Sequence, residues 1–519
     1  MQPLCRRLAA AAALAVLAMV PSAARAGDFV DTRVTLLFTD DNVLAKPGET
    51  TPSNPGARFG FANSTNTQFY DNFNTKYSGF ETLTNLVLYK KAPAFFDGLT
   101  TEAALALNLL VAREKPTTSL SSVVLADASS YLTLKYTPKG WDEKREGVTL
   151  TGFPLSADRF RLGYAYKISW GGSEIFGTSR SESVPGAKLQ FSKALNPDQL
   201  AYGYVGMKST IILNDKVHEQ EANYGVLAGA GVDITRWLRF DISGGWFMKG
   251  VNPTTSVLGA PVRAEGLSSQ LVFHWGVPVG SSVDFALYKN DPDMPSRVFS
   301  PEAYPGGFSL SASIEGSYLA QTLADPDVFG QTKVQAAYAG ALQVRAKYDY
   351  WRISALGLWR SVTFIEFNVP GFPPYNDFPK GTSLGDEKFL AVGFDRYFPA
   401  LHLTPGLMGG IQIPASYTTS GDMGGNNPPP SLQGKRTVVI RDASSSPSIL
   451  PSNQGAKMIY SVKGNARWDL SDFFSFIAEV YYTRDDNRFT FKDSAEGVAE
   501  PTQENPDILG FNVMLQARF

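Results

Sequence analysis

The chain ends with the sequence DILGFNVMLQARF, residues 507–519. Apolar residues stand at every second position of this stretch. One face carries Leu509, Phe511, Val513, Leu515, Ala517 and Phe519, and the other carries Gly510, Asn512, Met514, Gln516 and Arg518. Because successive side chains of a β-strand point to opposite faces, this period of two predicts a strand with one apolar face.

This ending resembles the C-terminal β-signal of bacterial outer-membrane proteins, which has a terminal aromatic residue preceded by apolar residues at alternate positions. The resemblance covers the final strand alone, so it indicates a class of protein and not a function. It implies that Phe511, Val513, Leu515 and Phe519 form an assembly signal that the barrel assembly machinery recognises. An unpaired strand edge is also, physically, a template for the addition of another strand.

The start of the chain has the features of an export signal. Residues 1–26 contain the basic pair Arg6-Arg7, an apolar run from Leu8 to Val20 and the A-x-A cleavage pattern Ala24-Arg25-Ala26. The apolar run is shorter than the roughly 20 residues that a membrane-spanning helix needs. We therefore expect a cleaved signal peptide over 1–26 and export of the mature chain to the outer membrane of a Gram-negative cell.

The composition excludes several classes of function. The single cysteine, Cys5, lies in the expected signal, so the mature chain has no thiol chemistry. The chain has 47 Lys+Arg against 49 Asp+Glu, with no basic tail, and no nucleic-acid partner is expected. After the signal, no apolar run is long enough for a transmembrane helix. The 12% aromatic content and 47 glycines suit strands and turns.

Alternating strands recur along the whole chain. The clearest alternation lies in 159–170, 308–318, 333–347 and 457–468. In the first of these, Phe160, Leu162, Tyr164, Tyr166, Ile168 and Trp170 share one face. Further strands are expected at 31–39, 79–90, 101–113, 128–137, 185–194, 201–213, 222–234, 237–248, 265–276, 281–290, 350–366, 387–398, 402–413, 473–484 and 507–519.

These segments predict an all-β fold, a transmembrane antiparallel up-and-down β-barrel that fills residues 27–519 as a single domain. A soluble sandwich or propeller is the alternative, because its half-buried strands alternate too. The length of the strands and the two chain ends favour the membrane. A barrel with both termini in the periplasm has an even number of strands. The candidates number nineteen, and the up-down parity fails around 291–349. We therefore expect 18 strands, with 16 or 20 as alternatives.

The lengths of the connections indicate at which end of the barrel each connection lies. Short links are expected at Ala92–Gly98, Asn196–Gln199, Thr235–Arg236, Val277–Gly280, Tyr397–Leu401 and Asp469–Asp472. The long extracellular loops are expected at 40–78, 249–264, 291–306, 367–386, 414–456 and 485–506. The segment 138–156 is a longer link than a periplasmic turn should be. The longest loops would form a constriction, a lid or an exposed mobile surface.

The inner faces of the predicted strands are rich in cations. The candidate pore-lining residues are Arg159, Arg161, Lys167, Lys188, Arg239, Lys333, Arg345, Lys347, Lys463 and Arg467. Fewer acids face inward, among them Glu102, Asp241, Glu315 and Glu479. Cations on a low-dielectric wall attract anions, so this excess favours anionic solutes. The alternative is that these side chains are paired and solvated wall residues.

Enzyme chemistry is not indicated. The three histidines, His218, His274 and His402, lack a second ligand at metal spacing, so no metal or other cofactor is expected. His274 and Ser268 share one strand face, but nothing identifies a nucleophile, and no catalytic residue is assigned. There is no dinucleotide or phosphate-binding loop in a strand-to-helix context.

The sequence therefore predicts a porin-like outer-membrane channel for small hydrophilic solutes, with anions favoured. Its partners would be outer-membrane lipid, the barrel assembly machinery and the solutes themselves, while monomer and trimer both stay open. The alternative is a barrel anchor whose surface loops bind a partner. A third hypothesis is an outer-membrane lipase or protease.

Overall fold

The structure, a computed structural model, describes residues 29–40, 42–44, 84–92, 94–113, 121–127, 130–143, 145–155, 157, 160–163, 184–214, 217–275, 307–366, 375–418, 434–438, 448–493 and 499–518. The expected signal peptide at 1–26 and the terminal Phe519 lie outside these residues.

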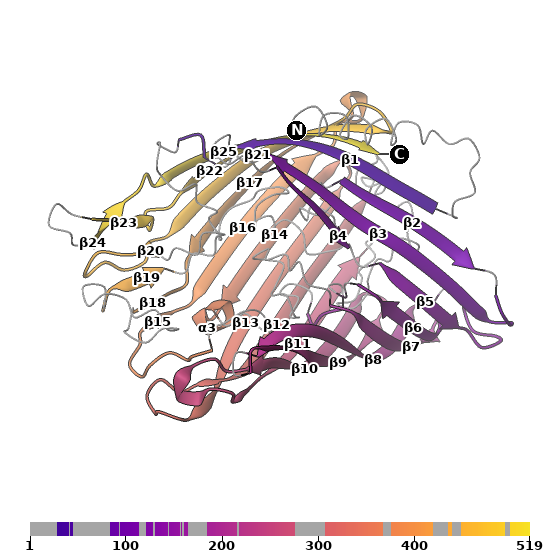
Figure 1. Ribbon diagram of the computed structural model, residues 1–519. Helices are drawn as coiled ribbons and strands as arrows, with labels where there is room; N and C mark the ends of the chain where they lie inside the picture. Colours follow the sequence, from indigo (N-terminus) through magenta and orange to yellow (C-terminus); the bar gives the residue numbers. More distant parts are fainter. Residues whose placement is uncertain are drawn as a thin grey trace, which may run out of the picture.

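Nineteen strands of the described chain form one antiparallel sheet that closes on itself (Figure 1). They are β1 (Phe29–Asp40), β2 (Thr84–Ala92), β3 (Leu99–Arg113), β4 (Ser121–Asp127), β5 (Tyr131–Tyr136), β6 (Gly147–Phe153), β7 (Gly186–Asn196), β8 (Gln199–Asn214), β9 (Glu219–Thr235), β10 (Leu238–Val251), β11 (Pro261–Trp275), β12 (Phe308–Ala324), β13 (Thr332–Tyr348), β14 (Trp351–Arg360), β16 (Glu387–Arg396), β17 (Leu403–Ile413), β21 (Ile459–Asp469), β22 (Phe474–Arg484) and β25 (Asp507–Arg518). The strands follow one another around the wall in chain order, so the barrel is of the up-and-down type that the alternation predicted.

Two short strands, β4 and β5, occupy a single position in this wall. The C-terminal half of β3, residues 107–113, pairs with β4, and its N-terminal half, residues 99–104, pairs with β5. The nineteen described strands therefore make eighteen wall positions, as expected. At the break, the Ser130 hydroxyl accepts a hydrogen bond from the Ala106 N–H (2.9 Å) and donates to the Ala106 carbonyl (3.3 Å). A serine side chain thus replaces the missing backbone partner of Ala106.

The first and last wall strands close the barrel. β1 pairs with β2 through Phe29–Arg33 and with β25 through Arg33–Asp40. On the outer side of this seam the rings of Phe38 and Phe511 lie 5.6 Å apart. The C-terminal strand that the sequence singled out is therefore the strand that completes the wall.

The wall separates an apolar outside from a polar inside. On β12, Ile314 is 59% exposed, whereas the next residue, Glu315, is 2% exposed. The same alternation puts large apolar side chains on the outside of most wall strands, including Leu189, Val205, Val226, Ile242, Leu271, Leu342, Ile353, Val392, Leu407, Val462 and Val480. An apolar outer face on a sheet that pairs with itself around the ring is what a bilayer requires of a β-structure.

Short links gather at one end of the barrel, which we call the turn end. They join β2 to β3, β7 to β8, β9 to β10, β13 to β14, β16 to β17 and β21 to β22. Aromatic residues surround this end: Trp237 lies 5.4 Å from Trp275, and Tyr350 lies 6.0 Å from Tyr397. Rings at this level are typical of the interface between lipid and water. The opposite end, where most long connections lie, is called the loop end.

One strongly alternating segment is not a wall strand, so the strand predicted at 159–170 is wrong. After β6 the chain leaves the wall, because β6 pairs directly with β7, and the described residues Phe160 and Leu162 lie on the inner side of the barrel. Phe160 and Leu162 are fully buried there. The wall strand at this position is instead β6, which lies within 138–156, where only a long link was expected. The segment β4 was also missed, because the prediction of 128–137 covered only β5.

Two other expectations change. Trp275 of β11 pairs directly with Leu310 of β12, so no wall strand lies between them, and the connection containing 291–306 starts and finishes at the turn end. The predicted strand 281–290, the predicted short link Val277–Gly280 and that loop lie outside the described residues. The strand predicted over 350–366 is shorter, because β14 ends at Arg360 and a helix, α3 (Val362–Glu366), follows.

The described long connections carry small elements of their own. β15 (Leu384–Gly385), β18 (Ser416–Thr418), β19 (Arg436–Val438) and β20 (Ser448–Ile449) form a four-stranded sheet. β23 (Phe489–Asp493) and β24 (Ala499–Gln503) form a hairpin. Within the described part of the chain, no helix has the length and apolar character needed to cross a membrane.

Candidate functional site

The lumen of the barrel is the candidate functional site, because the polar side chains of the wall converge there. The lumen-facing acids expected from the sequence, Glu102, Asp241, Glu315 and Glu479, are all buried on the inner side. Additional inward acids, which the sequence did not single out, are Asp233, Glu387 and Asp395. Strand alternation could have found them, since Glu387 and Asp395 are eight residues apart on β16 and Asp233 is ten residues from the inward Asn223 on β9.

Most inward cations whose contacts are described are held by an acid on the same or the next strand. The pairs are Arg239 with Asp233 (2.6 Å), Arg352 with Asp395 (2.7 Å), Lys463 with Glu479 (2.7 Å), and Arg360 with Glu387. Arg467 at the turn end pairs with Asp469 (2.8 Å). Each pair joins neighbouring strands or, for Arg467 and Asp469, two positions of one strand, so the barrel wall neutralises its own charges locally.

The candidate pore-lining residues divide into three groups. Lys188, Arg239, Lys333, Arg345, Lys347, Lys463 and Arg467 occupy inward positions of described wall strands. Arg161 lies in the inward segment and not on a wall strand. Arg159 and Lys167 lie outside the described residues. Lys188 donates to Gln190 (2.8 Å), so its amine also has a partner on the wall.

The inward segment, which consists of the described residues 157 and 160–163, packs against glycines of the inner wall. A Cβ atom at Gly206 would lie 2.6 Å from the Phe160 ring, and one at Gly245 would lie 3.0 Å from Leu162. The Phe160 ring also meets Tyr204 edge-on at 5.9 Å. The buried Lys208 amine donates to the Phe160 carbonyl (2.8 Å). The segment is thus seated on β8 and β10 by matched shapes and a charge-assisted hydrogen bond.

A polar strip, with Glu315 as its acid, lies beside this segment on β11, β12 and β13. It consists of the inward residues Ser268, Gln270, Ser309, Ser311, Ser313, Glu315, Ser317 and Gln343. The Ser268 hydroxyl contacts Glu315 (3.2 Å) and Ser317 (3.1 Å). His274 is six residues along the strand from Ser268, about 20 Å away. These two residues therefore do not form a nucleophile and base, and within the described residues no group of His, Cys, Asp and Glu could hold a metal ion.

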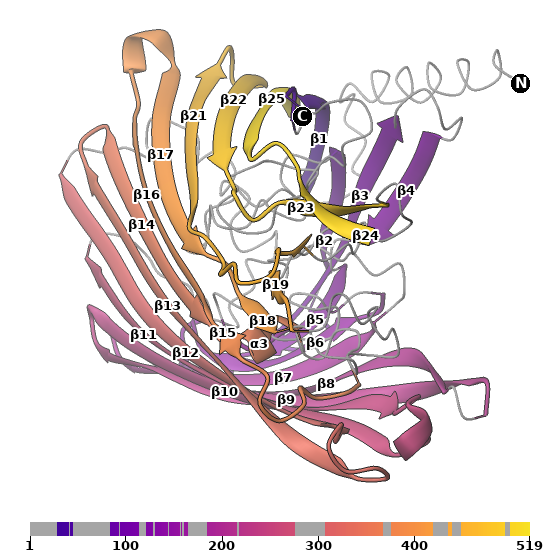
Figure 2. The same ribbon diagram turned by 90° about the vertical axis from the view of Figure 1, so that its left-hand side faces the viewer.

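A folded structure at the loop end, which we call the cap, lies across the mouth of the barrel. Figure 2 shows α3, the four-stranded sheet and the β23–β24 hairpin within the outline of the wall strands. The cap is built from three connections, those between β14 and β16, β17 and β21, and β22 and β25. Because β15 from the first pairs with β18 from the second, the connections hold one another.

The side of the cap nearest β13 is tied to the wall by Asp377. This carboxylate accepts an ion-pair contact from Lys333 (2.8 Å), and its neighbour Phe378 packs on Tyr417 at 5.2 Å. Burial raises the pKa of the Asp377 carboxyl above its ordinary range, against the opposing effect of the hydrogen bond from Lys333. The Arg436 guanidinium donates to Ser383, which ties β19 to the segment before β15.

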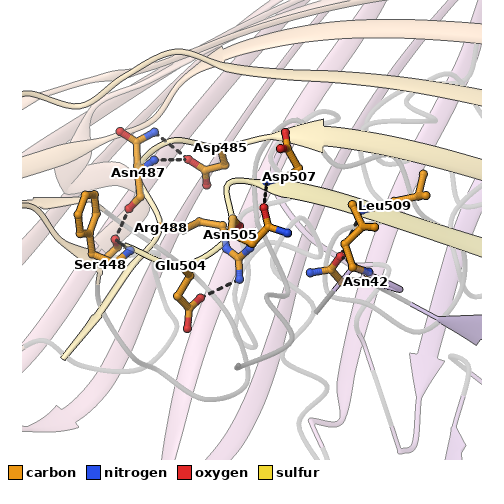
Figure 3. A network of polar contacts seen from close by, with 11 residues as sticks. Asn42, Ser448, Asp485, Asn487, Arg488, Glu504, Asn505, Asp507 and Leu509 are labelled. Atoms are coloured by element: carbon orange, nitrogen blue, oxygen red, sulfur yellow. Dashed lines mark hydrogen bonds and ion pairs between the residues drawn. The ribbon is translucent and has the colours of Figure 1, made fainter. Parts of the chain in front are cut away.

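The opposite side of the cap is held by a buried polar network (Figure 3). The Asn487 side chain accepts from the Lys457 N–H (2.6 Å) and donates to the Lys457 carbonyl (2.8 Å) and to Asp485 (2.8 Å). The Ser448 hydroxyl donates to the Asn487 carbonyl and accepts from the Phe489 N–H (3.0 Å). This network joins the end of the β17–β21 connection to the start of the hairpin.

The hairpin base is closed by Arg488. Its guanidinium pairs with Glu504 (2.7 Å) and donates to the Asn505 carbonyl. In Figure 3, Asn42 lies next to Leu509 at the start of β25, and its side-chain oxygen accepts the Leu509 N–H (3.3 Å). Sequence alternation gave no signal for Asn42, Arg488 and Glu504, since they lie in connections outside the wall strands.

Comparison with known proteins finds similar folds among solved structures. Acinetobacter baumannii OccAB1 covers 94% of this chain and 95% of its own, at 8% identity and a TM-score of 0.44. The match to the outer membrane protein OprD from Pseudomonas aeruginosa covers 94% of this chain and 92% of OprD, at 10% identity and a TM-score of 0.40. Wzi of Escherichia coli is described as a carbohydrate-binding β-barrel involved in capsule assembly. Its match covers 94% of this chain and 84% of Wzi, at 10% identity and a TM-score of 0.38. No protein-family model and no curated protein sequence matches the chain.

Proposed function

We propose that this protein is a channel of the bacterial outer membrane that lets small hydrophilic solutes pass. The single observation that supports this most is the two-sided wall: large apolar side chains cover its outside, and charged and hydroxylated side chains cover its inside. A barrel of this strand number is wide enough to leave an aqueous interior. The apolar outside is suited to outer-membrane lipid.

Solute size is limited by two structures. The inward segment narrows the lumen along β8 and β10, where Phe160 and Leu162 are seated. The cap narrows the mouth at the loop end. Both are held by buried hydrogen bonds, so they act as fixed constrictions, and we expect exclusion of large solutes.

Charge selectivity should be weak, with a preference for anions. The wall pairs most of its cations with acids, which reduces the field in the lumen. Cations are concentrated at one place, where Arg345, Lys347 and Arg352 lie on neighbouring strands near the turn end. Asp395 binds Arg352 there. An anion that enters this region meets more positive than negative charge on the wall.

Planar-bilayer recording of the refolded chain 27–519 tests the proposal. We expect steady single-channel conductance, and a reversal potential in a salt gradient that indicates modest anion preference. Arg345→Gln combined with Lys347→Gln should shift the reversal potential toward cation preference. Lys90→Gln, which changes an exposed lysine on the outer face of β2, should leave the reversal potential unchanged. A barrel that folds, as shown by its heat-modifiable migration in gels, but never conducts would refute the channel.

The cap supports a second candidate function. Three connections fold together into one structure at the loop end, which would also present a fixed surface to a protein partner. A barrel that serves as such an anchor needs no conductance. Capture of one defined partner by the intact barrel, and loss of capture when the cap is cut by limited proteolysis, would favour this function over the channel.

A further inference from the structure

Three cations of the described turn end lie over aromatic rings, and they differ in how their charge is balanced. Lys193 pairs with Glu146 at 2.9 Å, so its charge is neutralised beside the ring. Arg236 and Arg396 have no acid partner among the described residues. Arg236 is exposed over the single ring of Trp237, whereas Arg396 is half-buried and contacts two rings. Of the three, Arg396 is the cation that is fixed in place while its charge stays available to a ligand.

Arg396 is the last residue of β16, and its side chain lies on the outer face of the wall. Strand alternation fixes this side, because Phe394 is 47% exposed to the outside and the intervening Asp395 is buried on the inside. In the strand register Arg396 stands opposite Trp351, the first residue of β14, which is also on the outer face. The guanidinium therefore lies at the edge of the apolar band, at the level of the aromatic rim of the turn end.

Two aromatic rings hold this guanidinium. Its Cζ atom lies 4.9 Å from the ring centroid of Trp351 and 4.8 Å from that of Phe398. Such contacts restrict the motion of an arginine side chain and leave N–H groups at the edge of the guanidinium to donate. The acid of the neighbouring β13–β14 turn, Asp349, is engaged on the side of β12, where it accepts from the Gly307 N–H (3.4 Å). The outer rim thus presents a positive and preoriented donor.

A lipid phosphate is the group that suits this donor. The apolar outer face is in contact with lipid, so the anionic groups that reach its rim belong to lipid headgroups. A phosphate offers oxygens that match the fork of N–H donors on a guanidinium. The acyl chains of the same lipid can lie along the outward side chains of Val392 and Phe394 on the same strand. A free phosphate ion would gain the ionic contact alone.

We propose that Arg396, together with Trp351 and Phe398, forms a binding site for the phosphate of a phospholipid on the outer face of the barrel. The guanidinium donates to the phosphate oxygens, and the two rings hold it in the headgroup layer. The site goes beyond the proposed channel and does not depend on conduction, because it lies on the lipid side of the wall.

Native mass spectrometry of the refolded chain 27–519, titrated with lipid in maltoside micelles, tests the site. Dioleoylphosphatidylglycerol is the probe, and dioleoylglycerol, which has the same acyl chains without the phosphate, is the comparison lipid. The phospholipid should bind more tightly than dioleoylglycerol. Arg396→Gln should weaken phospholipid binding about tenfold, the usual effect of losing a charge-assisted hydrogen bond, and leave dioleoylglycerol binding unchanged. Arg396→Lys should restore only part of the affinity, because an ammonium lacks the planar fork.

Lys388→Gln is the matched control, because it removes one positive charge from the outer face of the same strand at the loop end. This variant should bind the phospholipid like the parent chain, and heat-modifiable migration checks that each variant folds. Equal binding of the two lipids, full phospholipid affinity in Arg396→Gln, or displacement of the phospholipid by inorganic phosphate would overturn the site. A barrel that binds the phospholipid through Arg396 but never conducts refutes the channel and supports the site.

Discussion

The ring of Tyr481 on β22 lies over Gly510 on β25, its partner in the strand register. A Cβ atom at position 510 would lie 2.3 Å from both Cζ and Oη of this tyrosine, so the ring fills the space that a side chain would need. Tyr481 is fully buried on the inner wall. The closing strand is therefore fitted to its neighbour by one aromatic residue and one glycine.

Replacing Gly510 with alanine should destabilise the closed barrel. The new methyl group displaces the Tyr481 ring from a packed position, and overpacking of this kind costs about 1–3 kcal/mol. Urea unfolding of the barrel in micelles, followed by its heat-modifiable migration, measures the loss. Gly464→Ala on β21, the other neighbour of β22, is the matched control, because nothing lies within 4 Å of a Cβ there. Equal stability of the two variants would show that the ring does not occupy this space.

Phe160→Ala should increase single-channel conductance. The Phe160 ring anchors the inward segment on Gly206 and Tyr204, and its removal takes away about 3–5 kcal/mol of packing. The segment then loses its packing against the wall, and the lumen widens along β8 and β10. Phe191→Ala, which removes an exposed ring from the outer face, should leave conductance unchanged. If both variants conduct like the parent chain, the inward segment does not limit the channel.

Asn487→Ala should loosen the cap without unfolding the wall. The change removes the side-chain hydrogen bonds to the Lys457 N–H, the Lys457 carbonyl and Asp485, while Asp485 keeps the bond from the residue 487 N–H, and we expect a loss of about 1–3 kcal/mol. We expect faster proteolysis within 448–458 and 485–506 and an unchanged urea midpoint for the wall. Gln454→Ala removes an exposed side chain from the same connection and should cleave at the parental rate. A lower urea midpoint in Asn487→Ala would instead show that Asn487 contributes to the stability of the wall.

Acidification should release the turn between β5 and β6. Hydrogen bonds from Lys193, and from the backbone N–H groups of Asp142 and Ala194, lower the pKa of Glu146. Because the folded pKa lies below the unfolded value, the contribution to stability is present above the ordinary glutamate range of about 4.3. It is lost as the pH falls through the lowered pKa.

Trp141 reports on this turn, because Lys193 lies 3.9 Å over its ring and Phe191 meets it edge-on at 5.9 Å. The fluorescence of Trp141, isolated by difference against Trp141→Phe, should change in this acid range. The change should be absent in Glu146→Gln. A transition that persists in that variant would assign the titration to another group.

Sequence alternation predicted the wall well. Every second residue of a wall strand must face lipid, and this pattern can be recognised in the sequence of each strand by itself. It separated Ile314 from Glu315, and Tyr460 and Val462 from Lys463, on the correct sides. It also identified β25 as a strand, and the register shows that this strand closes the barrel.

The same alternation failed at 159–170, for a physical reason. Phe160 and Leu162 are buried against Gly206 and Gly245 inside the barrel, and an apolar face buried on an inner wall has the same period as one that faces lipid. The split fourth wall position was missed because Ser130 replaces a backbone partner with its side chain, which no strand pattern contains.

The candidate site was predicted only in part. The inward positions of Lys463 and Glu479 follow from the pattern of each strand, but their pairing follows from the register between strands, which alternation does not fix. The acids Asp377 and Glu504 lie in long connections, where neither period nor length indicates a partner. The cap therefore could not be foreseen from the sequence.

The most direct test of the account compares two single-cysteine variants of the chain 27–519, which has no cysteine of its own. Ile353 on β14 is 53% exposed on the outer face, and Ser354 beside it faces the lumen. In proteoliposomes, a charged water-soluble thiol reagent should modify Ser354→Cys and reduce conductance, while Ile353→Cys should react only after the vesicles are dissolved in detergent. Modification of Ile353→Cys in intact vesicles, with Ser354→Cys protected, would contradict a wall that separates an aqueous lumen from lipid.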